Sequence, residues 1–521
     1  MTAPARRAAL LRLVPLALFV VAGCRAPLTA APAPSATGAA AAGSAGRPGG
    51  ATVSPDRARL TALADSLLDD PMFRSAHWGV LVVDPLTGDT LLSRNAGKLF
   101  MPASNQKLLT GAAALTLLGG DFTFETRVLG AAYPIHGILT GDLAVMGSGD
   151  PSVSDSLAGG DAMAPLYALA DSLAARGVRE VTGRLVRGAD AFPDSSLGFG
   201  WSWDDLDYGY SAPVDELFFN EGFARVTVVG GARAGAPVAV RTSPARTVPR
   251  IGRVEVATSD TARRSRVQWE SDVRGARPQL TLRGAVRPGD SVTVEVALRH
   301  SAAAWLDAFH EALVARGITV HGGVEADAVA DTSGLVTLAT RTSPPLRTIL
   351  PRFEKPSQNQ IGEILLKTLG RVRAGVGSAD SGRRVVERQL VAWGADSLGF
   401  AVRDGSGLSR HDYVSPETIV KVLDAMRRHP EFRTYYDALP IAGVDGTIRS
   451  RMKGTPAEGN VHAKTGTIDK ARALSGYVTT RDGRLLLFST IANNHVVANR
   501  EVERVQDALL AFLAGATIGA R

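Results

Sequence analysis

The chain has 521 residues, of which 45% are hydrophobic and 21% are charged, and its formal net charge is +7. This length exceeds what one hydrophobic core organises and indicates two to four domains, while the composition excludes a disordered or fibrous protein. The basic residues are scattered rather than clustered, so we expect no nucleic-acid partner.

The first 23 residues have the pattern of a targeting segment. Arginines precede an apolar run over 13–22 that is too short to span a membrane in the mature protein. The run ends in Ala22-Gly23-Cys24, which resembles the lipobox of bacterial lipoproteins, whose cysteine becomes the lipidated first residue. We therefore expect a lipoprotein signal peptide over 1–23, lipidation at Cys24 and a periplasmic protein anchored to a membrane of the cell envelope. The alternative is an ordinary secretory signal with a chance cysteine near its end.

Residues 24–52 are nearly all alanine, glycine, proline, serine and threonine. Such a segment cannot bury enough apolar surface to fold, so we expect a disordered tether. Cys24 is the single cysteine of the chain, which excludes an intramolecular disulfide.

The first folded region is predicted to contain a helix, a hairpin and a second helix. Apolar residues recur at helical spacing over 54–68, and two strands over 78–83 and 90–94 flank a turn. The next helix is predicted from Ser104 to residue 118, where two glycines follow. Ser104 would then lie at a helix N-terminus, where backbone N–H groups favour negative charge.

From residue 122 to 341 the pattern changes to short strands and glycine-rich turns, interrupted by helices near 163–175 and 303–316. Residues 237–298 are poor in helical pattern and contain alternating polar and apolar runs, which indicates a small β-rich domain within a larger insertion. The predicted division is a catalytic domain over 53–121 and 342–521, inserted domain II over 122–236 and 299–341, and inner domain III over 237–298.

Helical and hairpin patterns return in the last third of the chain. We predict helices over 361–370, 381–393 and 418–428, a hairpin of strands 474–480 and 485–491, and a final helix over 501–513. The two ends of the chain thus supply helix, hairpin and helix, as if one α/β domain were split by the insertion.

Ser104 and Lys107 form a candidate pair of nucleophile and base. Residues three apart on a helix share a face, so the Lys107 amine can accept the proton of the Ser104 hydroxyl. A lysine does this only if burial and positive neighbours lower its pKa. Ser450 and Lys453 have the same spacing, but a glycine and a proline follow them, so a helix there is ending. Taken alone, Ser104 also fits a helix cap beside an exposed lysine.

A second candidate segment, Ser357-Gln358-Asn359, precedes the helix predicted at 361. Ser357 can pass a proton between the leaving group and the base, and Asn359 can hold Lys107 and the substrate amide. Taken alone, the segment also fits a turn and helix cap.

The third candidate segment is Lys464-Thr465-Gly466-Thr467, at the start of the C-terminal strand region. Lys464 supplies positive charge, Gly466 allows a close backbone approach, and the N–H of Thr467 can face an oxyanion. Taken alone, it also fits a strand start with a glycine bulge.

The order of Ser-x-x-Lys, Ser-x-Asn and Lys-Thr-Gly resembles penicillin-binding proteins and serine β-lactamases. The gap before Ser357 is far longer than the gap after it, as in the class C low-molecular-mass D-alanyl-D-alanine carboxypeptidase/endopeptidase family. Further stretches resemble this family over about residue 54 to the C-terminus, at 147–151, 201–205, 404–410 and 453–464. Gln358 departs from the aspartate common at that position.

The resemblance implies an α/β (α+β) catalytic domain of the serine β-lactamase/DD-peptidase type, split by two nested, mainly β inserted domains. It implies hydrolysis of peptidoglycan stem peptides through an acyl-enzyme on Ser104, inhibition by β-lactams, and no metal or cofactor. Lys107 would be the base, the N–H groups of Ser104 and Thr467 would bind the oxyanion, and Lys464 and Thr465 would bind the substrate's terminal carboxylate. The alternatives are a serine β-lactamase and a non-catalytic wall-binding lipoprotein.

Overall fold

The computed structural model describes residues 55–188, 191–271 and 279–518. The predicted signal peptide, the lipidation site Cys24 and the tether over 24–52 therefore lie outside the described residues. Within the described ranges, no helix is both long and apolar enough to cross a bilayer.

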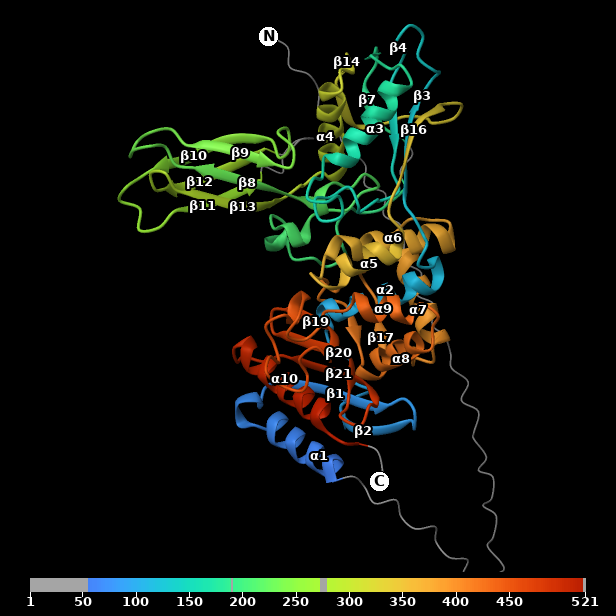
Figure 1. The fold of residues 1–521 in the computed structure, drawn as a ribbon, viewed down its shortest axis with the longest axis vertical. Coiled ribbons are helices and arrows are strands. Elements are labelled where there is room, and N and C mark those ends of the chain that lie inside the picture. The colour runs from blue at the N-terminus through green and yellow to red at the C-terminus, as the bar shows by residue number, and fades with distance from the viewer. Residues whose placement is uncertain (1–54, 189–190, 272–278, 519–521) are drawn as a thin grey trace, which may run out of the picture. The chain divides into compact units, whose positions relative to one another are not determined.

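A five-stranded antiparallel sheet joins the two ends of the chain. Its strand order is β19-β20-β21-β1-β2, so the N-terminal hairpin lies beside the C-terminal strands (Figure 1). The pairing of β1 with β21 runs from His77 opposite Asn493 to Val83 opposite Leu487. The strands are β1 (His77–Asp84), β2 (Asp89–Arg94), β19 (His462–Ile468), β20 (Ala471–Thr479) and β21 (Leu485–Asn493).

Helices cover both faces of this sheet. On one face α1 (Pro55–Leu68) and α10 (Asn499–Gly515) pack their apolar stripes onto the strands, with Leu60 and Leu509 in the shared core. On the other face α2 (Gln106–Leu118) and α8 (Pro416–Arg427) contribute residues such as Leu109 and Ile419 to a second core. The remaining helices of that layer are α5 (Leu346–Glu354), α6 (Asn359–Ala374), α7 (Ala379–Ala392) and α9 (Phe432–Ala438), with the short pair β17 (Phe400–Ala401) and β18 (Tyr413–Val414).

The long insertion has its own sheets and cores. A five-stranded sheet in the order β15-β7-β5-β3-β16 packs against α3 (Ala164–Ala175) and α4 (Ser301–Ala315). Its strands are β3 (Glu125–Gly130), β5 (Leu143–Met146), β7 (Leu185–Arg187), β15 (Val324–Val329) and β16 (Val336–Thr342), and a small sheet is made by β4 (Ile138–Leu139), β6 (Glu180–Val181) and β14 (Thr319–Val320).

Two three-stranded sheets, β10-β12-β11 and β13-β8-β9, share a core of small branched residues such as Val226 and Leu282. Their strands are β8 (Phe223–Val229), β9 (Ala239–Ser243), β10 (Ile251–Thr258), β11 (Arg266–Ser271), β12 (Leu280–Val286) and β13 (Ser291–Ala297). Strand β8 precedes the predicted start of the inner domain at 237, yet it pairs with β9 and β13. Strand β8 therefore belongs with the inner β strands, and the local pattern did not reveal this because one of its two partners, β13, lies more than 60 residues later.

Ser104 differs in local structure from its predicted place in an α-helix. It lies in a 3-10 turn, Ala103–Asn105, that leads into α2 at Gln106. Ala103 has a φ of 48°, in the left-handed region, so the chain bends sharply just before Ser104. Lys107 is the second residue of α2 and lies in its first turn.

Candidate active site

The Lys107 amine is fully buried and lies among three oxygen atoms. Its Nζ is 3.0 Å from Ser104 Oγ, and it donates to Asn359 Oδ1 and to the Ser406 carbonyl, each at 2.7 Å. A neutral amine has two N–H groups and one lone pair. With both N–H groups used by Asn359 and Ser406, the lone pair is left for the Ser104 hydroxyl, which is the arrangement that a base requires.

Burial and, to a smaller extent, the positive charge of Lys464 lower the pKa of Lys107 to about 7, against the opposing effect of Asp404, Glu354 and Glu363. A substantial fraction of Lys107 is therefore neutral at physiological pH. The predicted pair thus meets the electrostatic condition for an activated serine.

Ser357 and Lys464 also contact each other. Lys464 Nζ donates to Ser357 Oγ at 2.8 Å and to the Thr465 carbonyl at 3.1 Å. The Lys464 side chain is 0% exposed, and burial lowers its pKa to about 8. Its ammonium therefore lies behind Ser357 and does not line the cleft itself.

Strand β19 packs directly on the turn that carries Ser104. A Cβ on Gly466 would lie 2.3 Å from the Pro102 carbonyl oxygen, so only glycine permits this approach. Asn105 Nδ2 donates to the Lys464 carbonyl at 2.8 Å and fixes the register of the two segments. Thr465 and Thr467 then line the cleft on either side of Gly466.

Asn359 is the first residue of α6, and both ends of its amide are held. Oδ1 accepts from Lys107, and Nδ2 donates to the Tyr210 carbonyl at 2.7 Å. Gln358 caps the helix by accepting from the Ile361 N–H at 3.0 Å. The Tyr210 carbonyl comes from the insertion, and no sequence pattern indicated that a backbone group there would orient Asn359.

A buried loop supplies the carbonyl of Ser406. The Asp404 carboxylate accepts from the N–H groups of Gly407 and Ser409, at 2.6 and 2.7 Å, and from Trp201 Nε1 at 2.9 Å. A Cβ on Gly407, whose φ is +83°, would lie 1.8 Å from the Ala103 carbonyl oxygen. Sequence patterns identify the stretches 201–205 and 404–410 only by their resemblance to the family and assign them no role. In the structure they meet and hold the loop that orients Lys107.

A cleft of about 500 Å³ opens above these groups. Of the predicted residues, Ser104, Ser357, Asn359, Thr465 and Thr467 line it. The lining residues that sequence analysis missed come from separate segments, and include Asp205, Tyr210, Leu408, Arg410, Thr447 and Asp469.

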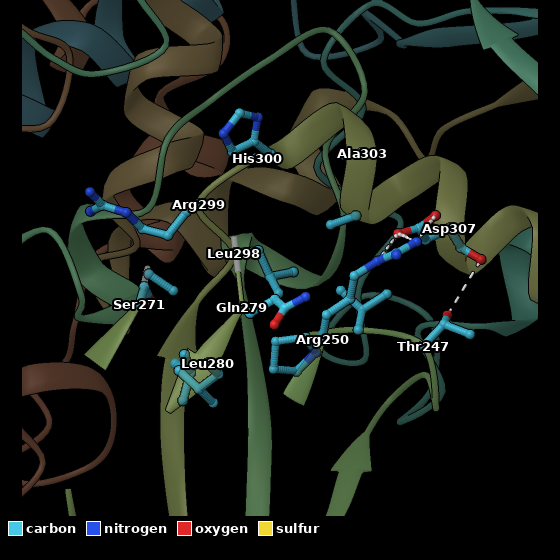
Figure 2. Close-up of a pocket in the computed structure, with 15 residues that line it drawn as sticks. Thr247, Arg250, Ser271, Gln279, Leu280, Leu298, Arg299, His300, Ala303 and Asp307 are labelled. Carbon is cyan, nitrogen blue, oxygen red and sulfur yellow. Dashed lines mark hydrogen bonds and ion pairs between the residues drawn. The ribbon is translucent and has the colours of Figure 1, made fainter. Parts of the chain in front are cut away.

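A much smaller cavity, about 50 Å³, lies where β12 and β13 meet α4. Figure 2 shows Arg250 extended across it toward Asp307, with which it forms an ion pair at 3.1 Å. None of the three sequence motifs contributes to its lining. The cleft above Ser104 is therefore the candidate active site.

The sheet built from both chain ends, the serine in the cleft with a buried lysine beside it, and the second lysine that contacts Ser357 from the edge strand define a serine acyl-transfer hydrolase of the DD-peptidase type. The model of the D-Ala-D-Ala carboxypeptidase 3 (S13) family matches residues 60–516, and the chain belongs to this family. The family and fold class expected from the motifs are confirmed.

Characterised proteins are similar over most of the chain. A D-alanyl-D-alanine carboxypeptidase of Actinomadura sp. (strain R39) is 37% identical over 475 residues, covering 88% of this chain and 85% of the relative. The crystal structure of penicillin binding protein 4 from Haemophilus influenzae is 25% identical, with a TM-score of 0.73, covering 86% of this chain and 98% of that one. A second structure of that protein, in complex with a β-lactam, has a TM-score of 0.67.

Proposed function

We propose that this protein hydrolyses the D-Ala-D-Ala end of peptidoglycan stem peptides through an acyl-enzyme on Ser104. The observation that supports this most directly is the Lys107 amine, whose two N–H groups have acceptors and whose lone pair faces Ser104 Oγ at 3.0 Å. Ser104 Oγ attacks the carbonyl of the penultimate D-Ala as Lys107 takes its proton.

The N–H groups of Ser104 and Thr467 would bind the oxyanion that forms. In related chemistry, loss of one such donor costs about a hundredfold or more in turnover. Ser357, whose Oγ accepts from Lys464 Nζ at 2.8 Å, relays the proton that Lys107 has taken to the leaving D-Ala amine, so that Lys107 is neutral again. Water then hydrolyses the ester and restores Ser104.

The substrate's terminal carboxylate would lie against Thr465, a half-buried residue whose Oγ1 donates to Thr447 Oγ1 at 2.7 Å. Lys464 is buried, so we propose that it attracts this carboxylate by its charge through Ser357 and Thr465 rather than by direct contact.

Labelling with a fluorescent penicillin tests the nucleophile. We expect one covalent adduct on the unmodified protein and none on Ser104→Ala, with both proteins showing the same cooperative thermal unfolding. Absence of an adduct on the folded unmodified protein would exclude the proposal. Equal labelling of both would move the nucleophile to another residue.

Endopeptidase activity is proposed beside carboxypeptidase activity because both reactions cleave after D-Ala. Purified muropeptides distinguish the two activities. Release of free D-Ala measures carboxypeptidase activity, and loss of crosslinked dimers measures endopeptidase activity. Release of D-Ala without loss of dimers would restrict the function to carboxypeptidase. The family match favours either peptidase over a β-lactamase.

We also propose that the protein is a periplasmic lipoprotein, cleaved after residue 23 and lipidated at Cys24. Support comes from the apolar run, the lipobox-like end and the tether-like composition of 24–52. Detergent partitioning of the unmodified protein and of Cys24→Ser in the native host should differ, with the variant in the aqueous phase. Identical partitioning would contradict lipidation.

The division into a catalytic domain (53–121 and 342–521), domain II and an inner domain III remains a proposal. It is supported by separate hydrophobic cores in each unit, with the inner unit now taken to start at Phe223.

A further inference from the structure

Glu354, the last residue of α5, is a buried carboxylate that takes no part in the catalytic steps proposed above. Its side chain is 0% exposed, and neither carboxylate oxygen accepts a hydrogen bond from any residue in the described part of the chain. A buried polar group without hydrogen-bond partners is destabilising, and more so when it is charged. An apolar residue would be more stable at such a position, so the carboxylate calls for an explanation.

The carboxylate lies against the face of α2 that carries the base. A Cβ on Gly111 would be 2.7 Å from Glu354 Oε1, and Gly111 follows Lys107 by four residues, one turn along the same face. The absence of a side chain at 111 makes room for the carboxylate beneath the Ser-Lys pair.

Three titratable groups from neighbouring elements face Glu354. They are Lys107 on α2, Lys464 on β19 and the Tyr435 hydroxyl on α9, which itself donates to the Leu108 carbonyl at 3.1 Å. The other charges of α5 are paired elsewhere, Arg347 with Asp121 and Arg352 with Glu221, and the next residue, Lys355, pairs with Asp445. Burial raises the pKa of Glu354 to about 7, although the two lysines oppose that rise. The carboxyl group is therefore partly protonated in the free enzyme, and a lysine that gains a proton beside it favours the ionised form.

The charge of the site changes during the reaction. Before acylation Lys107 is neutral and Lys464 carries a proton. Once Lys107 takes the Ser104 proton, two ammonium groups lie in one water-poor site and repel each other, as the lowered pKa of Lys107 beside Lys464 indicates. A negative charge close to both reduces this repulsion when it is largest.

We propose that Glu354 is a positioning residue of the reaction: its carboxylate, set between α2 and β19, is the counter-charge that lets Lys107 become protonated beside a protonated Lys464. This inference rests on the proposed function, since it assumes that Lys107 is the base. Asp404 and Glu363 also raise the pKa of Lys107 by their negative charge. Unlike Glu354, both accept hydrogen bonds from backbone N–H groups, so their burial is explained by their role in holding the 404–410 loop.

The test is the pH dependence of the second-order rate of acylation by a chromogenic cephalosporin. Acylation rises with pH as Lys107 becomes neutral and falls as Lys464 loses its proton. Removing a nearby negative charge lowers the pKa of both lysines. In Glu354→Gln we therefore expect both limbs of the profile to move to lower pH by about one unit, the lower end of what a charge at close range produces.

Two further variants keep the test decisive. Glu354→Leu removes the charge without burying a new polar group and should shift the limbs in the same direction. Glu354→Asp retains the charge and should keep them near the positions of the unmodified protein. The control Glu417→Gln removes an exposed carboxylate on α8 and should change neither limb.

A folded Gln or Leu variant with unmoved limbs overturns the inference, even if its rate is lower, because a purely structural role changes the amplitude alone. Misfolding of both uncharged variants beside an intact Asp variant would assign the carboxylate to stability and overturn it too. Failure of the unmodified protein to react at all would instead refute the proposed function.

Discussion

At the scale of single residues, the site depends on two lysines that must hold opposite protonation states. Burial lowers the pKa of both, to about 7 for Lys107 and about 8 for Lys464, and Lys107 falls lower because Lys464 repels its proton. The sequence predicted the identities of these residues and the need for a lowered pKa. It did not predict that Lys464 would be buried behind Ser357, since that follows from the packing of β19.

The two pKa values predict a narrow, bell-shaped dependence of the acylation rate on pH for the unmodified protein. The rate should rise as the pH passes about 7, where Lys107 loses its proton, and fall as it passes about 8, where Lys464 does. In Lys464→Arg the guanidinium stays charged at every accessible pH, so the alkaline limb should vanish while the acid limb remains. Stopped-flow acylation between pH 5 and 10 measures both. An alkaline limb unchanged in the variant would show that another group produces it.

At the scale of elements, the site is made by the contact of three segments. The turn Ala103–Asn105 presents Ser104, α6 presents Asn359 from its first residue, and β19 runs beside the turn. Sequence patterns predicted each element and most of its bounds, because periodicity and turn residues are local signals. They placed Ser104 at the N-terminus of the α-helix, whereas it lies in the 3-10 turn directly before it, because the bend at Ala103 depends on contacts with distant segments.

Gly466→Ala tests the contact between β19 and the turn. The added Cβ would lie 2.3 Å from the Pro102 carbonyl oxygen, so β19 must move away and carry Thr467 with it. We expect the acylation rate to fall by about a hundredfold, as a displacement near 1 Å can produce, and the stability to fall by about 1–3 kcal/mol from overpacking.

Gly97→Ala is the matched control, because its nearest neighbour would be a Glu417 oxygen at 3.4 Å, an ordinary contact. This variant should keep both rate and stability. Calorimetry and cephalosporin acylation on both proteins give the comparison, and a Gly466→Ala protein as active as Gly97→Ala would contradict the assigned contact.

At the scale of the whole molecule, the insertion both contributes to the site and contains a separable part. Tyr210 and Glu221, near its middle, contact the second motif: Tyr210 through the carbonyl bonded to Asn359, and Glu221 through a carbonyl that accepts from Gln358 Nε2 at 3.1 Å. The inner β unit beyond them has its own core. Its two ends lie side by side, because the Leu298 N–H donates to the Gly222 carbonyl at 2.8 Å.

This geometry predicts that Phe223–Ala297 can be replaced by a short glycine linker. The shortened protein should fold and still be labelled by penicillin at Ser104. Its rate should drop by about 5- to 150-fold at most, because Asp207, near Tyr210, loses two hydrogen bonds from the inner unit, worth about 0.5–1.5 kcal/mol each. Ser104→Ala in the same background is the control. A folded deletion protein without labelling would show that the inner unit builds the site.

The sequence by itself determined the reactive groups and their local setting: a serine and a lysine one turn apart, a Ser-x-Asn segment before a helix, a lysine-glycine segment at a strand, and the elements around them. These follow from short-range periodicity and residue chemistry. Which further groups complete the site depends on how distant segments pack together. The carbonyls of Ser406 and Tyr210 and the carboxylate of Glu354 act on Lys107 and Asn359 from positions at least 100 residues away or from other helices. Such contacts leave no trace in local sequence, because any residue type has a carbonyl and a glutamate's position in space depends on how whole helices pack.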